Sequence, residues 1–155
     1  MGIEIERKFK VHGDRWRAPA DGERISQGYI PAEKAQIRVR LKGSSAYLTI
    51  KSRDLGISRA EFEYAIPVRD AEELLESFAR KPFIEKTRYN VTVGGRVWEI
   101  DEFHGAYAGM VIAEVELESA DAEVELPDWV SEEVTGDIRF TNEYLAAQLS
   151  GPDGE

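Results

Sequence analysis

Charged residues recur in this sequence as like-charge pairs separated by one residue. The acidic pairs are Glu4 and Glu6, Glu61 and Glu63, and Glu114 and Glu116, and the basic pairs are Arg38 and Arg40, and Lys86 and Arg88. Carboxylate oxygens bind hard divalent cations such as Mg²⁺ or Mn²⁺, whereas guanidinium and ammonium groups bind phosphate oxygens. The two kinds of pair together indicate a site for a polyphosphate and a divalent metal.

Each pair lies in a segment where apolar and charged residues alternate. This period of two is typical of a β-strand, because successive side chains of a strand point to opposite faces. In the first segment, residues 3–9, the side chains of Glu4, Glu6 and Lys8 share the face opposite an apolar row. One such strand alone would most simply turn its polar face to water. Repetition along the chain instead favours a face that gathers charge.

The alternating segments predict about eight strands, at residues 3–11, 24–30, 35–42, 46–52, 59–67, 83–93, 97–103 and 110–118. Gly43-Ser44 and Gly94-Gly95 are signals for tight hairpin turns. Helical spacing predicts helices at 70–79, with Asp70 as N-terminal cap and one stripe of Leu74, Leu75 and Phe78, and at 141–149, capped by Thr141. We expect an α+β fold, mainly antiparallel β, in which an eight-stranded closed β-barrel carries flanking helices.

Charged rows that point into such a barrel would line a chamber for one small ligand. The apolar rows would then face outward, and the two helices or a partner subunit must cover them. Buried charges of one sign are unfavourable without partners, so the chamber requires a guest of complementary charge. A polyanion with a divalent metal meets this requirement.

The bulk composition suits one compact domain over residues 1–155, with a mobile tail at 150–155. The formal net charge of −10 opposes binding to duplex nucleic acid and to anionic membranes. The absence of cysteine excludes disulfides and thiolate zinc sites, and two histidines are too few for a His-rich metal site. No segment is apolar enough to cross a membrane. We expect a soluble cytoplasmic protein, monomeric or homodimeric, whose partner is a small-molecule polyphosphate.

The segment Glu4-x-Glu6-x-Lys8 resembles the ExExK signature of the CYTH superfamily, the triphosphate tunnel metalloenzymes. The resemblance continues through residues 38–40, 49–51, 61–64, 85–89, 98–103 and 113–118, and 134–139 is similar to the bacterial stand-alone members. It implies an eight-stranded antiparallel tunnel, a bound linear triphosphate and a requirement for Mg²⁺ or Mn²⁺. The expected activity is hydrolysis of the terminal phosphoryl group, with inorganic tripolyphosphate as the first candidate substrate.

Roles follow from the chemistry of each side chain. The expected metal ligands, which also orient the attacking water, are Glu4, Glu6, Glu61, Glu63, Glu114 and Glu116. The expected triphosphate-binding residues are Lys8, Arg38, Arg40, Lys51, Lys86 and Arg88. The expected catalytic set is Glu4, Glu6, Lys8, Lys86 and Glu116. Asp101 is an additional candidate as a polar anchor, and Tyr29 as a residue that closes a tunnel mouth.

Several alternatives stay open at the level of sequence, because the signature indicates the chemistry more closely than the substrate. The family includes class IV adenylate cyclases and enzymes that hydrolyse nucleoside or thiamine triphosphates. A polyphosphate-binding module without turnover would carry the same charged rows. Outside the tunnel, Trp98 and Trp129 are expected to pack on the outer face of the barrel, His104 is expected to be structural, and the acidic runs at 72–73 and 132–133 are expected to face solvent.

Overall fold

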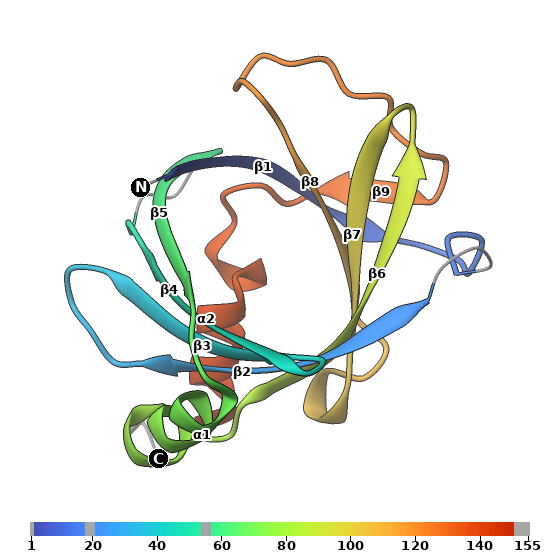
Figure 1. The fold of residues 1–155 in the computed structure, drawn as a ribbon. Helices are drawn as coiled ribbons and strands as arrows, with labels where there is room; N and C mark the ends of the chain where they lie inside the picture. The colour runs from blue at the N-terminus through green and yellow to red at the C-terminus, as the bar shows by residue number, and fades with distance from the viewer. Residues whose placement is uncertain (1, 18–20, 54–56, 151–155) are drawn as a thin grey trace.

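The computed structural model describes residues 2–17, 21–53 and 57–150 (Figure 1). Its strands are β1 (Gly2–Val11), β2 (Gly22–Ile30), β3 (Gln36–Lys42), β4 (Ser45–Lys51), β5 (Ser58–Ala65), β6 (Ile84–Val93), β7 (Arg96–Phe103), β8 (Val111–Glu116) and β9 (Val130–Glu133). The helices are α1 (Val68–Phe78) and α2 (Asn142–Ser150), with 3₁₀ turns at Gly105–Tyr107 and Ile138–Phe140. Apart from Ser150, which ends α2, the tail predicted to be mobile lies outside the described residues. None of the helices described is long and apolar enough to span a bilayer.

The strands form an antiparallel barrel, seen along its axis in Figure 1. Their order is β5-β4-β3-β2-β6-β7-β8-β1, and β1 closes the ring by pairing with β5 along residues 2–5 and with β8 along residues 6–10. The predicted eight-stranded closed barrel is confirmed. The short β9, which pairs with β1 at Phe9 and Val11, was not predicted. It carries the exposed Glu132 and Glu133, so these residues face solvent as expected, but from a strand.

The strand registers place the charged rows inside the barrel. Directly opposed residues share a face, and Glu6 lies opposite Glu116, while Arg88 lies opposite Asp101. The apolar residues between them, such as Val39 and Val115, face outward and are buried. Helix α1 covers one part of this outward apolar layer, as predicted, and the segment around Trp129 covers another.

Helix α1 covers the outer face of β2, β3 and β4. Ala71 and Leu75 of α1 pack with Val39 and Ala46, and Phe78 is 61% exposed, so it does not extend the predicted stripe into the core. Gly28 of β2 allows this close packing, because a Cβ atom there would lie 2.9 Å from the side chain of Leu75. The prediction that Asp70 caps α1 is wrong.

The N-terminus of α1 has no side-chain cap. The residue at the cap position is Pro67, and the helix begins at Val68, two residues before Asp70. Proline is tolerated where a helix begins because the first amide groups have no partner within the helix. Asp70 therefore lies in the first turn, where its negative charge interacts favourably with the helix dipole.

A connecting segment covers the opposite side of the barrel. Trp129, which precedes β9, packs edge to face on Trp98 with ring centroids 5.7 Å apart, and Trp98 contacts Phe9. Trp16, from the turn after β1, joins the same buried cluster. The expected outer packing roles of Trp98 and Trp129 are confirmed. The cover here is a loop and a short strand, whereas the sequence had suggested a helix or a partner.

Helix α2 was predicted to cover the outside of the barrel, and this prediction is wrong. Leu145 and Ala146 of α2 pack on Ile84, Phe103 and Ile112, which lie on the inward face of their strands. Figure 1 shows α2 within the ring of strands. The inner face is apolar at this end of the barrel, and Leu145 and Ala146 of α2 are buried against it. The helix therefore closes one end of the barrel.

Candidate active site

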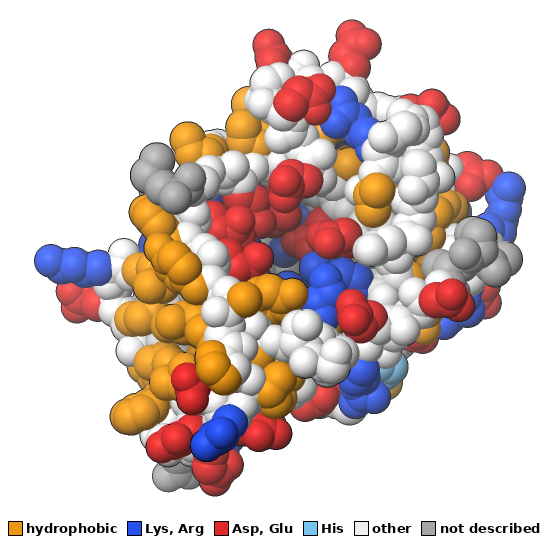
Figure 2. Space-filling model, viewed as in Figure 1, with side chains coloured by type: hydrophobic (Ala, Val, Ile, Leu, Met, Phe, Trp, Pro, Cys, Tyr) orange, Lys and Arg blue, Asp and Glu red, His pale blue; other side chains and the backbone are white. Residues whose placement is uncertain are grey.

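The barrel encloses a cavity of about 190 Å³ with an almost entirely polar lining. Figure 2 shows acidic side chains gathered around the hollow at its open end, with basic side chains beside and below them. All the predicted metal ligands and triphosphate-binding residues lie in this lining, and so does Tyr29. We call Glu4, Glu6, Glu61, Glu63, Glu99, Glu114 and Glu116 the acidic wall. We call Arg38, Arg40, Lys86 and Arg88 the basic wall.

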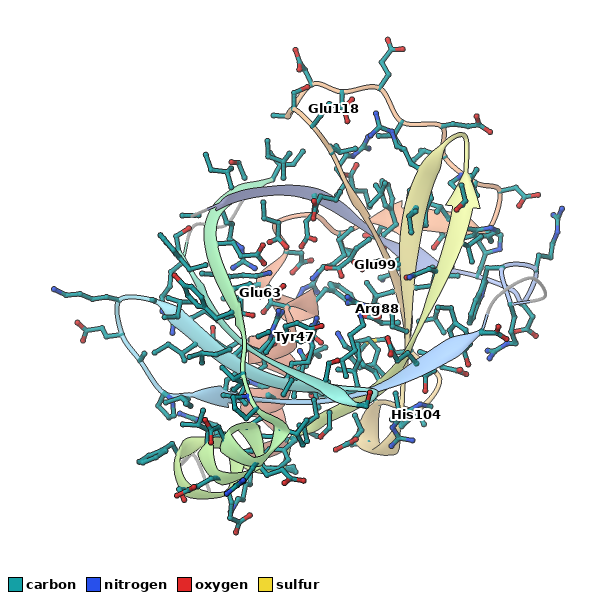
Figure 3. The ribbon with its side chains drawn as sticks, viewed as in Figure 1. Tyr47, Glu63, Arg88, Glu99, His104 and Glu118 are labelled. Carbon is teal, nitrogen blue, oxygen red and sulfur yellow. The ribbon has the colours of Figure 1, made fainter. Side chains whose placement is uncertain are left out.

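The direction of the side chains can be followed in Figure 3. Glu63, Glu99 and Arg88 point into the barrel from β5, β7 and β6. His104 lies outside, below the barrel, where its Nε2 atom is 2.7 Å from the hydroxyl of Thr87. This position agrees with the structural role expected for His104.

The acidic wall brings together seven carboxylates, of which Glu6 and Glu116 have no ion-pair partner among the described residues. Glu6 lies directly opposite Glu116, and Glu99 directly opposite Glu114, and like charges in such positions repel. The pKa of Glu6 is raised well above its usual range, first by burial and then by the charges of Glu114 and Glu4. Burial and neighbouring carboxylates also raise the pKa of Glu116. A bound cation would relieve this repulsion.

Two lysines lie between the walls. Lys51 Nζ donates to both oxygens of Glu4, at 2.9 and 3.1 Å. Lys8 Nζ lies 3.4 Å from Glu114 Oε2 and donates to the carbonyl oxygen of Phe140. Burial lowers the pKa of Lys8, but the charges of Glu114 and Glu6 outweigh it and raise the pKa. Lys8 therefore stays protonated and can reach a phosphate next to the carboxylates.

Asp101 holds the basic wall together. Arg88 donates to it through Nε at 2.7 Å and Nη2 at 2.9 Å, and Lys86 Nζ donates to it at 2.7 Å. Burial opposes ionisation of Asp101, but Arg88 and Lys86 outweigh it and hold the pKa of Asp101 below its usual range. Asp101 is buried behind these cations and is absent from the cavity lining. Asp101 therefore holds the side chains of Lys86 and Arg88 in place from behind the cavity lining.

The basic wall has more positive charge than its neighbours offset. No carboxylate in the described part of the chain lies within ion-pair distance of Arg40, whose Nε donates to Gln27 Oε1 at 2.8 Å. Burial, Arg38 and Arg88 lower the pKa of Arg40 to about 9. The Nε atom of Arg38 is buried with no hydrogen-bond partner. Such a cluster is costly unless an anion binds to it.

Sequence reasoning missed several lining residues. They are Gln36, Arg59, Thr141 and Asn142, and Lys42 and Glu99 also line the cavity although no role was predicted for them. Gln36 and Arg59 lie on the inward parity of their strands, so the alternation that found their charged neighbours could have found them. Thr141 and Asn142 belong to the beginning of α2, whose position inside the barrel the sequence did not indicate. Tyr29 lies at the α2 end, where its hydroxyl accepts a hydrogen bond from Gln27, and not at the open mouth.

The acidic wall suits a hard divalent cation. Among the residues described, no three histidine or carboxylate side chains converge into a complete metal shell. Mg²⁺ does not require one, because it commonly binds through one or two carboxylates together with water and substrate phosphates. Glu6 and Glu116 are an opposed pair of carboxylates of this kind in the cavity lining.

Comparison with known proteins gives a consistent result. Residues 2–145 match the CYTH domain family. An inorganic triphosphatase from Acetivibrio thermocellus is 49% identical over 146 residues, covering 94% of each chain. An inorganic triphosphatase from Nitrosomonas europaea is 36% identical, covering 94% of this chain and 98% of that protein. A crystal structure of an inorganic triphosphatase superposes with a TM-score of 0.66 at 33% identity, covering 94% of this chain and 95% of the other. The chain described here belongs to the CYTH family.

Proposed function

We propose that this protein hydrolyses inorganic tripolyphosphate inside its barrel, releasing the terminal phosphoryl group as phosphate. One observation carries the proposal: the same cavity is lined by an acidic wall whose opposed carboxylates Glu6 and Glu116 have raised pKa values and by a basic wall in which burial and neighbouring cations lower the pKa of Arg40. A triphosphate with a divalent metal complements both walls. Two relatives that cover nearly all of this chain are inorganic triphosphatases, which supports the same reaction.

The cations bind the triphosphate and hold it for in-line attack. The residues proposed for this role are Lys8, Arg38, Arg40, Lys51, Lys86 and Arg88. Phosphoryl transfer depends mainly on positioning and on stabilising the charge that develops on the transferred group. Arg38 and Arg40 can donate to phosphate oxygens through a planar fork, and Lys8 reaches from the same cavity toward the acidic wall.

The acidic wall would hold Mg²⁺ or Mn²⁺. The proposed ligands are Glu4, Glu6, Glu61, Glu63, Glu114 and Glu116, directly or through water. When bound, the metal lowers the pKa of water and neutralises charge on the phosphate oxygens. Glu6 and Glu116 orient the attacking water from the neighbouring strands β1 and β8. Lys8 pairs with Glu114 and Lys51 with Glu4, and these ion pairs limit the net negative charge of the wall.

Tripolyphosphate fits the cavity better than a nucleotide does. The lining offers almost no apolar surface on which a base could stack, and α2 closes one end of the barrel. We expect phosphate release from tripolyphosphate with Mg²⁺ or Mn²⁺ to exceed that from ATP or thiamine triphosphate by at least about tenfold in kcat/KM. A chelator should abolish it.

A substrate panel tests the proposed function. Phosphate release is measured for each triphosphate with each metal, and the products of ATP are separated by chromatography. A cyclic nucleotide product would assign the tunnel to a cyclase. Thermal stabilisation by tripolyphosphate without phosphate release under saturating metal would show a binding module and reject the hydrolase.

The titration of Lys86 predicts a pH dependence of binding. Burial, with Arg88 and Arg40, lowers its pKa to about 7 in the protein. This pKa lies below that of lysine in the unfolded chain, so the folded state gains stability as pH rises from about 7 toward the unfolded pKa. Over the same range Lys86 loses its proton, and with it the positive charge that would bind phosphate. Affinity for tripolyphosphate, measured calorimetrically in a chelator, should fall as pH rises above about 7.

The Lys86→Arg variant is the control for this titration, because arginine stays protonated throughout this range. It should lose the part of the pH dependence that comes from Lys86 and keep the part that comes from the triphosphate itself. Identical pH profiles for the variant and the wild type would contradict the prediction.

A further inference from the structure

Two uncharged amides connect the cations at the closed end of the tunnel. Gln27 of β2 accepts from Arg40 Nε at 2.8 Å, and its Nε2 atom donates to Asn142 Oδ1 at 3.1 Å. Asn142 Oδ1 also accepts from Lys86 Nζ at 2.8 Å. Gln27 donates as well to the hydroxyl of Tyr29 at 2.8 Å. A continuous chain of hydrogen bonds therefore runs from Arg40 through both amides to Lys86.

The direction of these bonds follows from the chemistry of the cations. Arginine and lysine can only donate, so each must face the oxygen of its amide partner. This requirement turns the Gln27 nitrogen toward Tyr29 and Asn142, and both of these groups accept from it. Gln27 is fully buried and lies directly opposite Arg40 in the pairing of β2 with β3. The network fixes the two cations in place.

The charge of these acceptors differs from that found elsewhere in the cavity. Lys51 is paired with the carboxylate of Glu4, and both Lys86 and Arg88 are paired with that of Asp101. Among the described residues Arg40 has no carboxylate partner, and the acceptor of its Nε atom is Gln27. A carboxylate at position 27 would pair with Arg40 in the same way, and the buried ion pair would offset its charge. Glutamine supplies the same acceptor atom without the charge.

We propose that Gln27 and Asn142 determine the affinity of the tunnel for its triphosphate. Gln27 positions Arg40 with an uncharged acceptor and leaves the charge of Arg40 for phosphate oxygens. Asn142 holds Lys86 without adding a second carboxylate to that of Asp101. This inference rests on the proposed function and assigns two positioning residues to it. It also gives α2 a part in the site, since Asn142 is the first residue of that helix.

Isosteric charge replacement tests this assignment. Gln27→Glu and Asn142→Asp keep the acceptor oxygen and add one negative charge beside Arg40 or Lys86. We expect KM for tripolyphosphate to rise by roughly 10-fold to 100-fold, as for the loss of a charged hydrogen bond. The change in kcat should be smaller, because the lost attraction acts on the ground state and the transition state alike. The ligand-free melting temperature of Gln27→Glu should rise, because its buried arginine gains a countercharge.

Gln148→Glu is the matched control, because it adds the same charge to an exposed position of α2. It should leave both KM and the melting temperature unchanged. Two measurements distinguish a failure of the proposed function from a failure of the roles of Gln27 and Asn142: phosphate release with metal, and thermal stabilisation by inorganic tripolyphosphate in a chelator. If the wild type releases no phosphate from tripolyphosphate with Mg²⁺ or Mn²⁺, the proposed function fails. If the wild type is stabilised and both isosteric variants are stabilised equally, the roles of Gln27 and Asn142 are rejected. A lower ligand-free melting temperature with unchanged KM would show that the amides are only structural.

Discussion

Replacing Glu6 by glutamine is expected to lower phosphate release from tripolyphosphate by about two to three orders of magnitude, the size typical for loss of one preorganised electrostatic group. Glu6 faces the cavity from the strand that closes the barrel, directly opposite Glu116. In the described part of the chain no ion pair offsets its charge, in contrast to Glu4 and Glu114. Its carboxylate is therefore available to a metal and to the attacking water. The rate is measured at saturating Mg²⁺ or Mn²⁺.

The same substitution should not weaken the fold. Burial and the charges of Glu114 and Glu4 all disfavour the ionised form of Glu6, and glutamine carries no charge. The metal-free variant should therefore melt at the same temperature as the wild type or higher. Glu132→Gln on the exposed strand β9 is the control and should retain full activity. Equal loss of activity in both variants would contradict the assignment of Glu6 to the acidic wall.

Replacing Asp101 by asparagine is expected to destabilise the protein by about 3–5 kcal/mol, the usual cost of removing one partner from a buried ion pair. The side chain of Asp101 accepts hydrogen bonds from both Arg88 and Lys86 and is almost completely buried. Asparagine has nearly the same shape, but it leaves Lys86 without a carboxylate partner among the described residues and leaves Arg88 with only the more distant Glu99 and Glu114. Urea unfolding without metal or substrate measures the loss.

Tripolyphosphate should partly reverse the loss of stability in the Asp101→Asn variant. Tripolyphosphate brings negative charge to Arg88 and Lys86, so it should stabilise Asp101→Asn by more than it stabilises the wild type. Glu118→Gln is the control, because Glu118 pairs with Arg96 at the exposed periphery of the barrel (Figure 3). That variant should unfold at nearly the wild-type urea concentration. Similar losses of stability in the two variants would show that Asp101 does not support Lys86 and Arg88.

The sequence alone predicted the lining of the tunnel well, and the reason is geometric. In a strand the face of a side chain depends only on its parity, so Glu4, Glu6 and Lys8 had to share a face whatever their neighbours were. Closure of the strands then brought the charged faces together. The same reasoning placed Trp98 on the outer face, where it packs with Phe9.

The position of α2 could not be predicted in this way. Its sequence shows helical spacing and the cap Thr141, but the surface it buries depends on which end of the barrel is apolar inside. That property arises from Ile84, Phe103 and Ile112, which belong to three different strands. Asn142 was missed for the same reason. Strand β9 was missed because four residues, three of them polar, show no clear alternation.

The double pairing of β1 also limits the order in which the chain can fold. Residues 2–5 pair with residues 58–61, whereas residues 6–10 pair with residues 112–116. During synthesis the first strand therefore leaves the ribosome long before its second partner exists. Contacts so distant in sequence must overcome a large loop-closure entropy, which slows folding. The part of β1 that carries Glu6 and Lys8 pairs with β8 in the C-terminal half of the chain, so the barrel cannot close and Glu6 cannot lie opposite Glu116 before that half has been made.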